Sequence, residues 1–97
     1  MAQVSMQFYE DHRVIGRCIS SVKAAQAILV ERGKKAAKLL RETGAQHVLY
    51  GCKIYSGDML VAVQLYMIPM DDAEFERITG KANQVIVYAI HRHGEAV

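Results

Sequence analysis

The stretch HVLYGCKIYSGDMLVAVQLYMI, residues 47–68, decides the fold of this 97-residue chain. It contains two apolar runs, 47–55 and 59–68, that are rich in the β-branched and aromatic residues typical of strands. The turn Ser-Gly-Asp at 56–58 separates them, and Gly57 suits the positive φ that a two-residue hairpin loop requires. The stretch therefore predicts a β-hairpin.

The turn also sets the register of this hairpin. With a loop at residues 57 and 58, Ser56 pairs with Met59, and each further pair follows one residue along both strands. One face is then almost entirely apolar, and its predicted pairs are Ile54 with Val61, Cys52 with Val63, Tyr50 with Leu65, and Val48 with Met67. The opposite face carries Leu49, Gly51, Lys53 and Tyr55 beside Leu60, Ala62, Gln64, Tyr66 and Ile68. We expect the first face to pack against helices.

Upstream of the hairpin, residues 21–43 predict a long helix. Their apolar residues form one stripe, made by Val22, Ala25, Leu29, Ala36 and Leu40. Ser20 or Ser21 is a suitable N-cap, and Gly44 follows as an end signal. Gly33 is unfavourable inside a helix, so it marks either a kink or a break into two shorter helices.

Two further segments precede this helix. Residues 3–9 alternate between apolar and polar side chains, which indicates a strand. Residues 13–20 allow two interpretations, because their apolar residues also keep helical spacing. We favour a strand, since Gly16 and the serines at 20 and 21 are poorly suited to a helix interior.

Downstream of the hairpin, the sequence predicts a short helix over 71–79. Asp71 is a good N-cap, and Glu74 lies three residues on, as in a capping box. Gly80 is expected to end the helix. Residues 84–92 then predict a last strand, which is apolar on both faces through Ile90.

Strand, long helix, hairpin, short helix and strand together give an α+β fold. This is the ferredoxin-like βαββαβ order within a single domain over residues 1–97, with residues 3–9 as a possible extra strand. Two helices cover one face of the antiparallel sheet and leave the other, largely apolar face without cover. We therefore expect a homodimer that forms through this sheet face.

Over about residues 13–92, the chain resembles the dimeric α/β-barrel superfamily. The likeness is carried by KKAAKLLRETGAQ (34–46), HVLYGCKIYSGDMLVAVQLY (47–66) and MDDAEFERI (70–78). Proteins of that superfamily include cofactor-free monooxygenases, haem-degrading enzymes, lactone isomerases and stress-induced proteins. The resemblance implies a homodimer with a pocket between sheet and helices or between two sheets, and it selects no single chemistry.

Composition excludes several classes of function. Twelve basic and ten acidic residues give a net charge of +2, which is too small a surplus to indicate a nucleic-acid partner. The longest apolar run, 59–70, is interrupted and is shorter than the ~20 residues that a membrane span needs. Cys18 and Cys52 fit no metal or redox motif, and we expect free thiols in a reducing cytoplasm. No cofactor is expected.

The candidate ligand-binding residues are Lys53, Gln64 and Tyr66. In the predicted register they are polar groups on one largely apolar face, which is the composition of a small-molecule pocket. Tyr66 can donate a hydrogen bond to a carbonyl or phenolate oxygen, and Lys53 can stabilise a developing anion. Alternatively, Lys53 extends to the rim of the barrel and Tyr66 packs at the dimer interface.

The histidines and cysteines give weaker signals. His91 and His93 lie on one side of the predicted last strand, but zinc usually takes three or four ligands, and a solvated strand end is the favoured interpretation. His47 is expected at an exposed strand end. Nothing in the sequence places a base beside Cys18 or Cys52, so buried structural thiols are favoured over nucleophiles. No metal site is expected.

Two functions of different classes remain open. The first is a small-molecule-binding homodimer, such as a cofactor-independent oxygenase or isomerase that acts on an apolar or aromatic ligand. The second is a non-catalytic module for ligand sensing or dimerisation. An enclosed cavity lined by Lys53, Gln64 and Tyr66 favours the first, and a sheet face filled by a partner's side chains favours the second.

Overall fold

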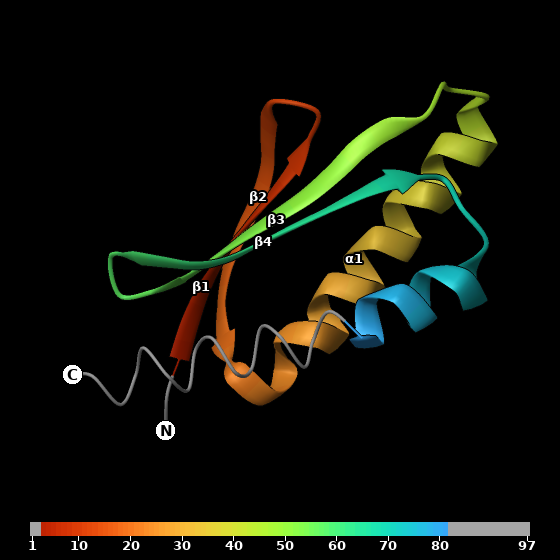
Figure 1. Cartoon of the computed structure of the whole chain (residues 1–97). Coiled ribbons are helices and arrows are strands. Elements are labelled where there is room, and N and C mark those ends of the chain that lie inside the picture. Colours follow the sequence, from red (N-terminus) through yellow and green to blue (C-terminus); the bar gives the residue numbers. More distant parts are fainter. Residues whose placement is uncertain (1–2, 82–97) are drawn as a thin grey trace.

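A computed structural model describes residues 3–81 and gives them an α+β fold of two layers. One layer is a four-stranded antiparallel sheet, and two helices lie together against one of its faces (Figure 1). The predicted last strand, 84–92, lies outside the described residues. The predicted βαββαβ order is therefore observed only as far as the second helix.

The sheet has the strand order β2-β1-β3-β4. Its strands are β1 (Gln3–Glu10), β2 (Arg13–Ser21), β3 (Val48–Ser56) and β4 (Met59–Ile68). The preference for a strand over residues 13–20 is thus confirmed. The segment expected as a possible extra strand is β1, and it pairs with β2 on one side and with β3 on the other. Its two-residue turn to β2 makes those strands neighbours, and its alternate apolar residues are all buried, as befits a central strand.

The turn between β1 and β2 is attached to the start of β3. The backbone N–H of Asp11 donates to the carbonyl oxygen of Leu49 at 2.8 Å. The N–H of Leu49 in turn donates to Oδ1 of Asp11 at 3.0 Å. Asp11 has a φ of 53°, a region that aspartate tolerates better than most residues. These two hydrogen bonds hold the tip of the first hairpin against the start of β3.

The second hairpin forms around Gly57, as predicted, but most of its predicted register is wrong. Ser56 pairs with Met59, and then a bulge between Ile54 and Tyr55 shifts the pairing by one residue. The observed pairs beyond it are Ile54 with Ala62, Lys53 with Val63, Cys52 with Gln64, Gly51 with Leu65, Tyr50 with Tyr66, Leu49 with Met67, and Val48 with Ile68. One extra residue in β4 therefore exchanges the two faces of that strand.

The long helix α1 (Val22–Thr43) follows the predicted bounds closely. The N–H of Ala24 donates to Oγ of the N-cap Ser21 at 3.1 Å, and Gly44 ends the helix in the left-handed conformation with a φ of 67°. Of the two alternatives at Gly33, a kink or a break, the break is excluded, because α1 is continuous over 22 residues. Gly33 is instead the point where Phe75 lies against α1, and an added Cβ there would overlap the Phe75 ring.

The second helix covers residues 72–81. Its predicted N-cap is confirmed, since the N–H of Glu74 donates to Oδ1 of Asp71 at 3.1 Å. Its predicted end at Gly80 is wrong, because residues 80 and 81 are also helical. Two ion pairs also join it to α1: one between Lys34 and Glu76, and one of 3.6 Å between Arg41 and Asp72.

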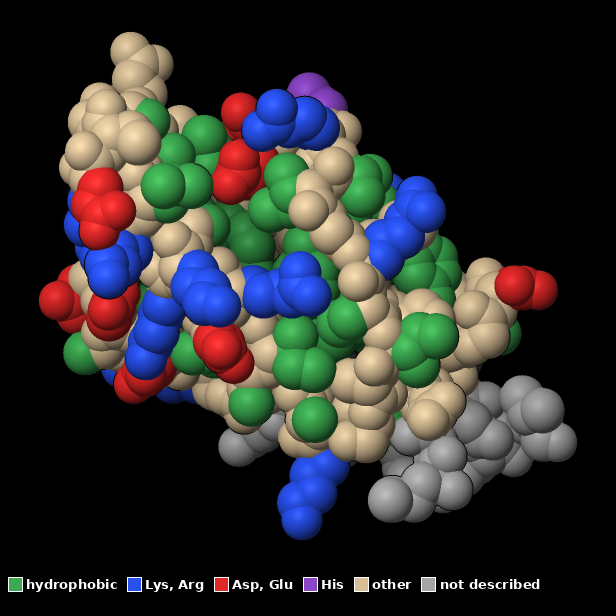
Figure 2. All heavy atoms as spheres, turned by 180° about the vertical axis from the view of Figure 1, so that it is seen from behind, with side chains coloured by type: hydrophobic (Ala, Val, Ile, Leu, Met, Phe, Trp, Pro, Cys, Tyr) green, Lys and Arg blue, Asp and Glu red, His purple; other side chains and the backbone are tan. Residues whose placement is uncertain are grey.

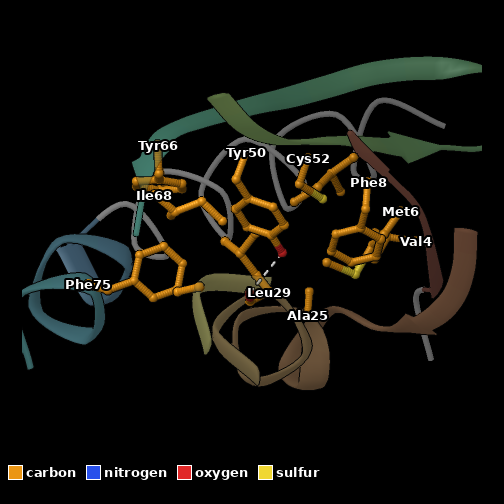
Figure 3. Packing of buried hydrophobic residues seen from close by; sticks show 12 residues of the cluster. Val4, Met6, Phe8, Ala25, Leu29, Tyr50, Cys52, Tyr66, Ile68 and Phe75 are labelled. Atoms are coloured by element: carbon orange, nitrogen blue, oxygen red, sulfur yellow. Dashed lines mark hydrogen bonds between the residues drawn. The ribbon is translucent and has the colours of Figure 1, made fainter. Parts of the chain in front are cut away.

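Tyr50 lies at the centre of the core between sheet and helices (Figure 3). Its hydroxyl donates to the carbonyl oxygen of Leu29 at 3.0 Å, so its buried polar atom is satisfied. Phe8 stacks beside it with ring centroids 6.3 Å apart, and Phe75 approaches at 6.2 Å. The buried hydrophobic residues are Val4, Met6, Phe8, Ala25, Leu29, Ala37, Tyr50, Cys52, Ile54, Tyr66, Ile68 and Phe75.

Candidate functional site

The structure separates the three predicted ligand-binding residues. Gln64 and Tyr66 lie on the face of β4 that packs under the helices, beside Cys52 and Tyr50. Lys53 lies on the other face of the sheet, which we call the open face. The expectation that all three share one face is wrong, because it depended on the register that the bulge shifts.

Tyr66 and Gln64 form a hydrogen bond with each other between the sheet and the helices. The Tyr66 hydroxyl donates to Oε1 of Gln64 at 2.6 Å, and the Tyr66 ring meets the edge of Phe75 with centroids 5.3 Å apart. Burial, with a smaller effect of Cys52, raises the pKa of Tyr66 to about 12. Tyr66 thus stays a neutral phenol that packs against the second helix.

Lys53 has different neighbours from those predicted. Its Nζ lies 5.1 Å from the centre of the Tyr9 ring, a distance typical of a cation–π contact. The Tyr9 hydroxyl donates to Oε1 of Gln7 at 2.6 Å. Gln7 is the direct cross-strand partner of Lys53 on β3 and of Arg17 on β2. Arg17, Gln7 and Lys53 therefore form a row across three strands, which we call the donor row.

Apolar side chains lie on both sides of the donor row. Ile19 of β2 is 70% exposed, and three residues of β4 on the same face are exposed by about half: Val63 at 45%, Leu65 at 59% and Met67 at 54%. We expected a largely apolar sheet face that no helix covers, and among residues 3–81 one is present with different members from those predicted. Figure 2, seen from behind the view of Figure 1, shows hydrophobic side chains interspersed with side chains of Lys, Arg, Asp and Glu.

Sequence reasoning missed Gln7, Tyr9 and Arg17. Their alternation with buried residues was visible, since Gln7 and Tyr9 are the polar positions of the strand at 3–9. Their approach to Lys53 depends on the strand order, which places β1 between β2 and β3. No local pattern in the sequence encodes that order.

The two thiols are free, as expected. Cys52 is buried, and burial, followed by the nearby Cys18, raises its pKa to about 12. A protonated thiol is a poor nucleophile, so Cys52 acts as a core residue. Among residues 3–81, no three His, Cys, Asp or Glu side chains gather closely enough to hold a metal ion. His91 and His93 lie outside the described residues.

Three surface hollows lie away from the open face. One of about 550 Å³ lies between the two helices and is lined in part by Lys34 and Glu76. Another of about 470 Å³ lies between β2 and α1, and a third of about 530 Å³ lies at the turn that holds Asp11. The hollow between β2 and α1 contains Cys18 and Arg32. Lys53, Gln64 and Tyr66 line none of these three hollows.

No protein-family model, no curated protein and no solved structure matches this chain. Within residues 3–81, neither helix is both long enough and apolar enough to cross a lipid bilayer. The chemistry of the open face is therefore the main basis for a functional proposal.

Proposed function

We propose that this protein is a homodimeric, non-catalytic binding protein of the cytoplasm, and that its open face takes a small molecule between two copies. The observation that carries this proposal is the convergence of Lys53, Gln7 and Tyr9 within an apolar surround. A few placed polar groups among apolar ones are the usual composition of a small-molecule site. The two free cysteines agree with a reducing compartment.

The proposed dimer has the form of a dimeric α/β barrel. Both helices pack on one side of the sheet, so the other side is the surface that a second copy can cover. Ile19, Leu65 and Met67 are each more than half exposed there. A twofold partner would bring the same apolar residues from its own sheet. The apolar area that each copy hides supplies the driving force for association.

An oxygenase or isomerase is the alternative function. Lys53 can stabilise an anion that develops on a ligand, and the Tyr9 hydroxyl lies beside it. Acid–base chemistry also requires a group that takes a proton from the ligand. Among the described residues of β1–β4, the side chains on the open face include no Asp, Glu or His. We therefore place binding ahead of catalysis.

A pair of matched variants tests the dimer. Leu65→Lys adds a charge to the open face, and Leu39→Lys adds the same charge to α1 at a residue of equal exposure, 58% against 59%. In sedimentation at micromolar concentration, we expect wild type and Leu39→Lys near twice the chain mass of 10.8 kDa. Leu65→Lys should sediment as a monomer. A wild-type monomer, or equal behaviour of the two variants, contradicts the proposal.

A further inference from the structure

We infer that the ligand of the open face is an organic anion with an apolar body, and that its binding strengthens the dimer. This inference rests on the proposed function, and it adds the chemical class of the ligand and a link between binding and assembly. The carrying observation is the composition of the donor row.

The donor row presents mostly hydrogen-bond donors. Arg17 and Lys53 carry donors and no acceptor, and Gln7 lies between them. The carbonyl oxygen of Gln7 already accepts from Tyr9, which leaves its NH₂ group to donate. Because neighbouring strands lie about 4.8 Å apart, the backbones of Arg17 and Lys53 are about 10 Å apart, with the amide midway. An anion seated over Gln7 is within reach of both long cationic side chains.

The protein supplies no counter-charge to this row within residues 3–81. The ion pairs that these residues make join other cations: Arg13 with Glu10, Lys34 with Glu76, Lys38 with Glu42, Arg41 with Asp72, and Arg77 with Glu74. Arg17 and Lys53 belong to none of them. Nine acidic residues lie within residues 3–81, so the shortage of negative charge in this part of the chain is local to the open face.

The shortage of negative charge on the open face should weaken the dimer. When two open faces close over each other, four cations leave bulk water and lie near one another without an anion. Covering an unpaired charge is unfavourable, and like charges repel more strongly as water is excluded. An anionic group between the sheets compensates this charge, and it binds the dimer better than the monomer. Such a ligand must shift the equilibrium toward the dimer.

The apolar side chains on both sides of the donor row indicate what the rest of the ligand is like. Ile19 lies on the β2 side of the donor row, and Leu65 and Met67 lie on the β4 side. A ligand whose charged end sits over Gln7 would place its body against these side chains. A small inorganic anion would leave them uncovered. A carboxylate on an aromatic or aliphatic body fits both parts of the face.

The test compares 2-naphthoate with its neutral amide, 2-naphthamide, which has the same apolar body. Sedimentation of the full chain at low salt gives the dimer dissociation constant with each probe. We expect 2-naphthoate to lower that constant at least tenfold and 2-naphthamide to change it less than threefold. Lys53→Met keeps the apolar stem and removes the charge, and Lys35→Met is a matched control on the exposed side of α1.

Lys53→Met should move the two measurements in opposite directions, which a merely structural role would not produce. Lys53→Met should form a tighter dimer than wild type without a probe, and it should lose most of the response to 2-naphthoate. Lys35→Met should follow wild type in both. This inference is overturned if the wild-type dimer is tight and its dissociation constant changes neither with 2-naphthoate nor with Lys53→Met. The proposed dimer would then still stand. Equal responses to the two probes also overturn this inference. A wild-type chain that is a monomer at micromolar concentration without a probe overturns the proposed function itself.

Discussion

At Gly33, a missing side chain lets three elements meet. The Phe75 ring of the second helix lies against the backbone of α1 there, and Tyr50 of β3 would be 3.2 Å from an added Cβ. Helix propensity disfavours glycine at this position by about 1 kcal/mol relative to alanine. The close packing of Phe75 against α1 outweighs the low helix propensity of glycine. A residue that predicts a helix break from the sequence is therefore the residue at which the two helices touch.

Gly33→Ala should therefore destabilise the protein. The new methyl group must displace Phe75, and overpacking of this kind costs about 1–3 kcal/mol. Urea unfolding should show a lower midpoint. Gly80→Ala is the matched control, because its Cβ would make an ordinary 3.5 Å contact with Gln26. We expect that variant to gain up to about 1 kcal/mol from helix propensity. A stabilised Gly33→Ala variant would show that the crossing is looser than described.

Burial of Cys52 makes the free energy of unfolding depend on pH in the alkaline range. Its pKa is raised from an ordinary 9.0 to about 12, chiefly by burial. Between these values the unfolded chain loses the proton while the folded chain keeps it, so the free energy of unfolding falls as pH rises above about 9. Below pH 9 the thiol is protonated in both states, so its contribution to the free energy of unfolding is fully present there. Cys52→Val should flatten the decline in urea titrations between pH 8 and 11, and an unchanged slope would contradict the assignment.

Among the elements, the bulge in the second hairpin has the widest effect. Both strands, their lengths and the turn at Gly57 follow from local sequence, and so do the caps at Ser21 and Asp71. The bulge does not, because the residues of β4 on either side of it are all apolar and tolerate both faces. The observed register buries Tyr66 beside Phe75, a contact with a residue outside the hairpin.

Two neighbouring residues of β4 distinguish the registers. Ile68 is 1% exposed and Met67 is 54% exposed, the reverse of the register without a bulge. Ile68→Ala should cost about 2–4 kcal/mol through lost packing. Met67→Ala should change stability by about 0.5 kcal/mol or less. Urea midpoints of the two variants measure the difference, and a larger loss for Met67→Ala would restore the simpler pairing.

For the molecule as a whole, the class of fold is predictable and the composition of the site is not. Helix and strand positions follow from local periodicity, and an apolar sheet face without a helix over it follows from counting two helices against four strands. The donor row needs the order of the strands as well, because Gln7 meets Lys53 only through β1–β3 pairing. Those residues are 46 positions apart, beyond the reach of any periodic pattern.

The placement of β1 has a consequence for truncation and for tags. Removal of β1 would take away the strand that, within residues 3–81, pairs with β2 on one side and with β3 on the other. β2 would then lose its hydrogen-bonded neighbour, and β3 would become an edge with its N–H and C=O groups unpaired. A protein that lacks residues 1–10 should show little strand signal in circular dichroism and a strong tendency to aggregate. A purification tag placed ahead of β1 is better attached through a flexible linker, because β1 begins at Gln3 and pairs on both sides.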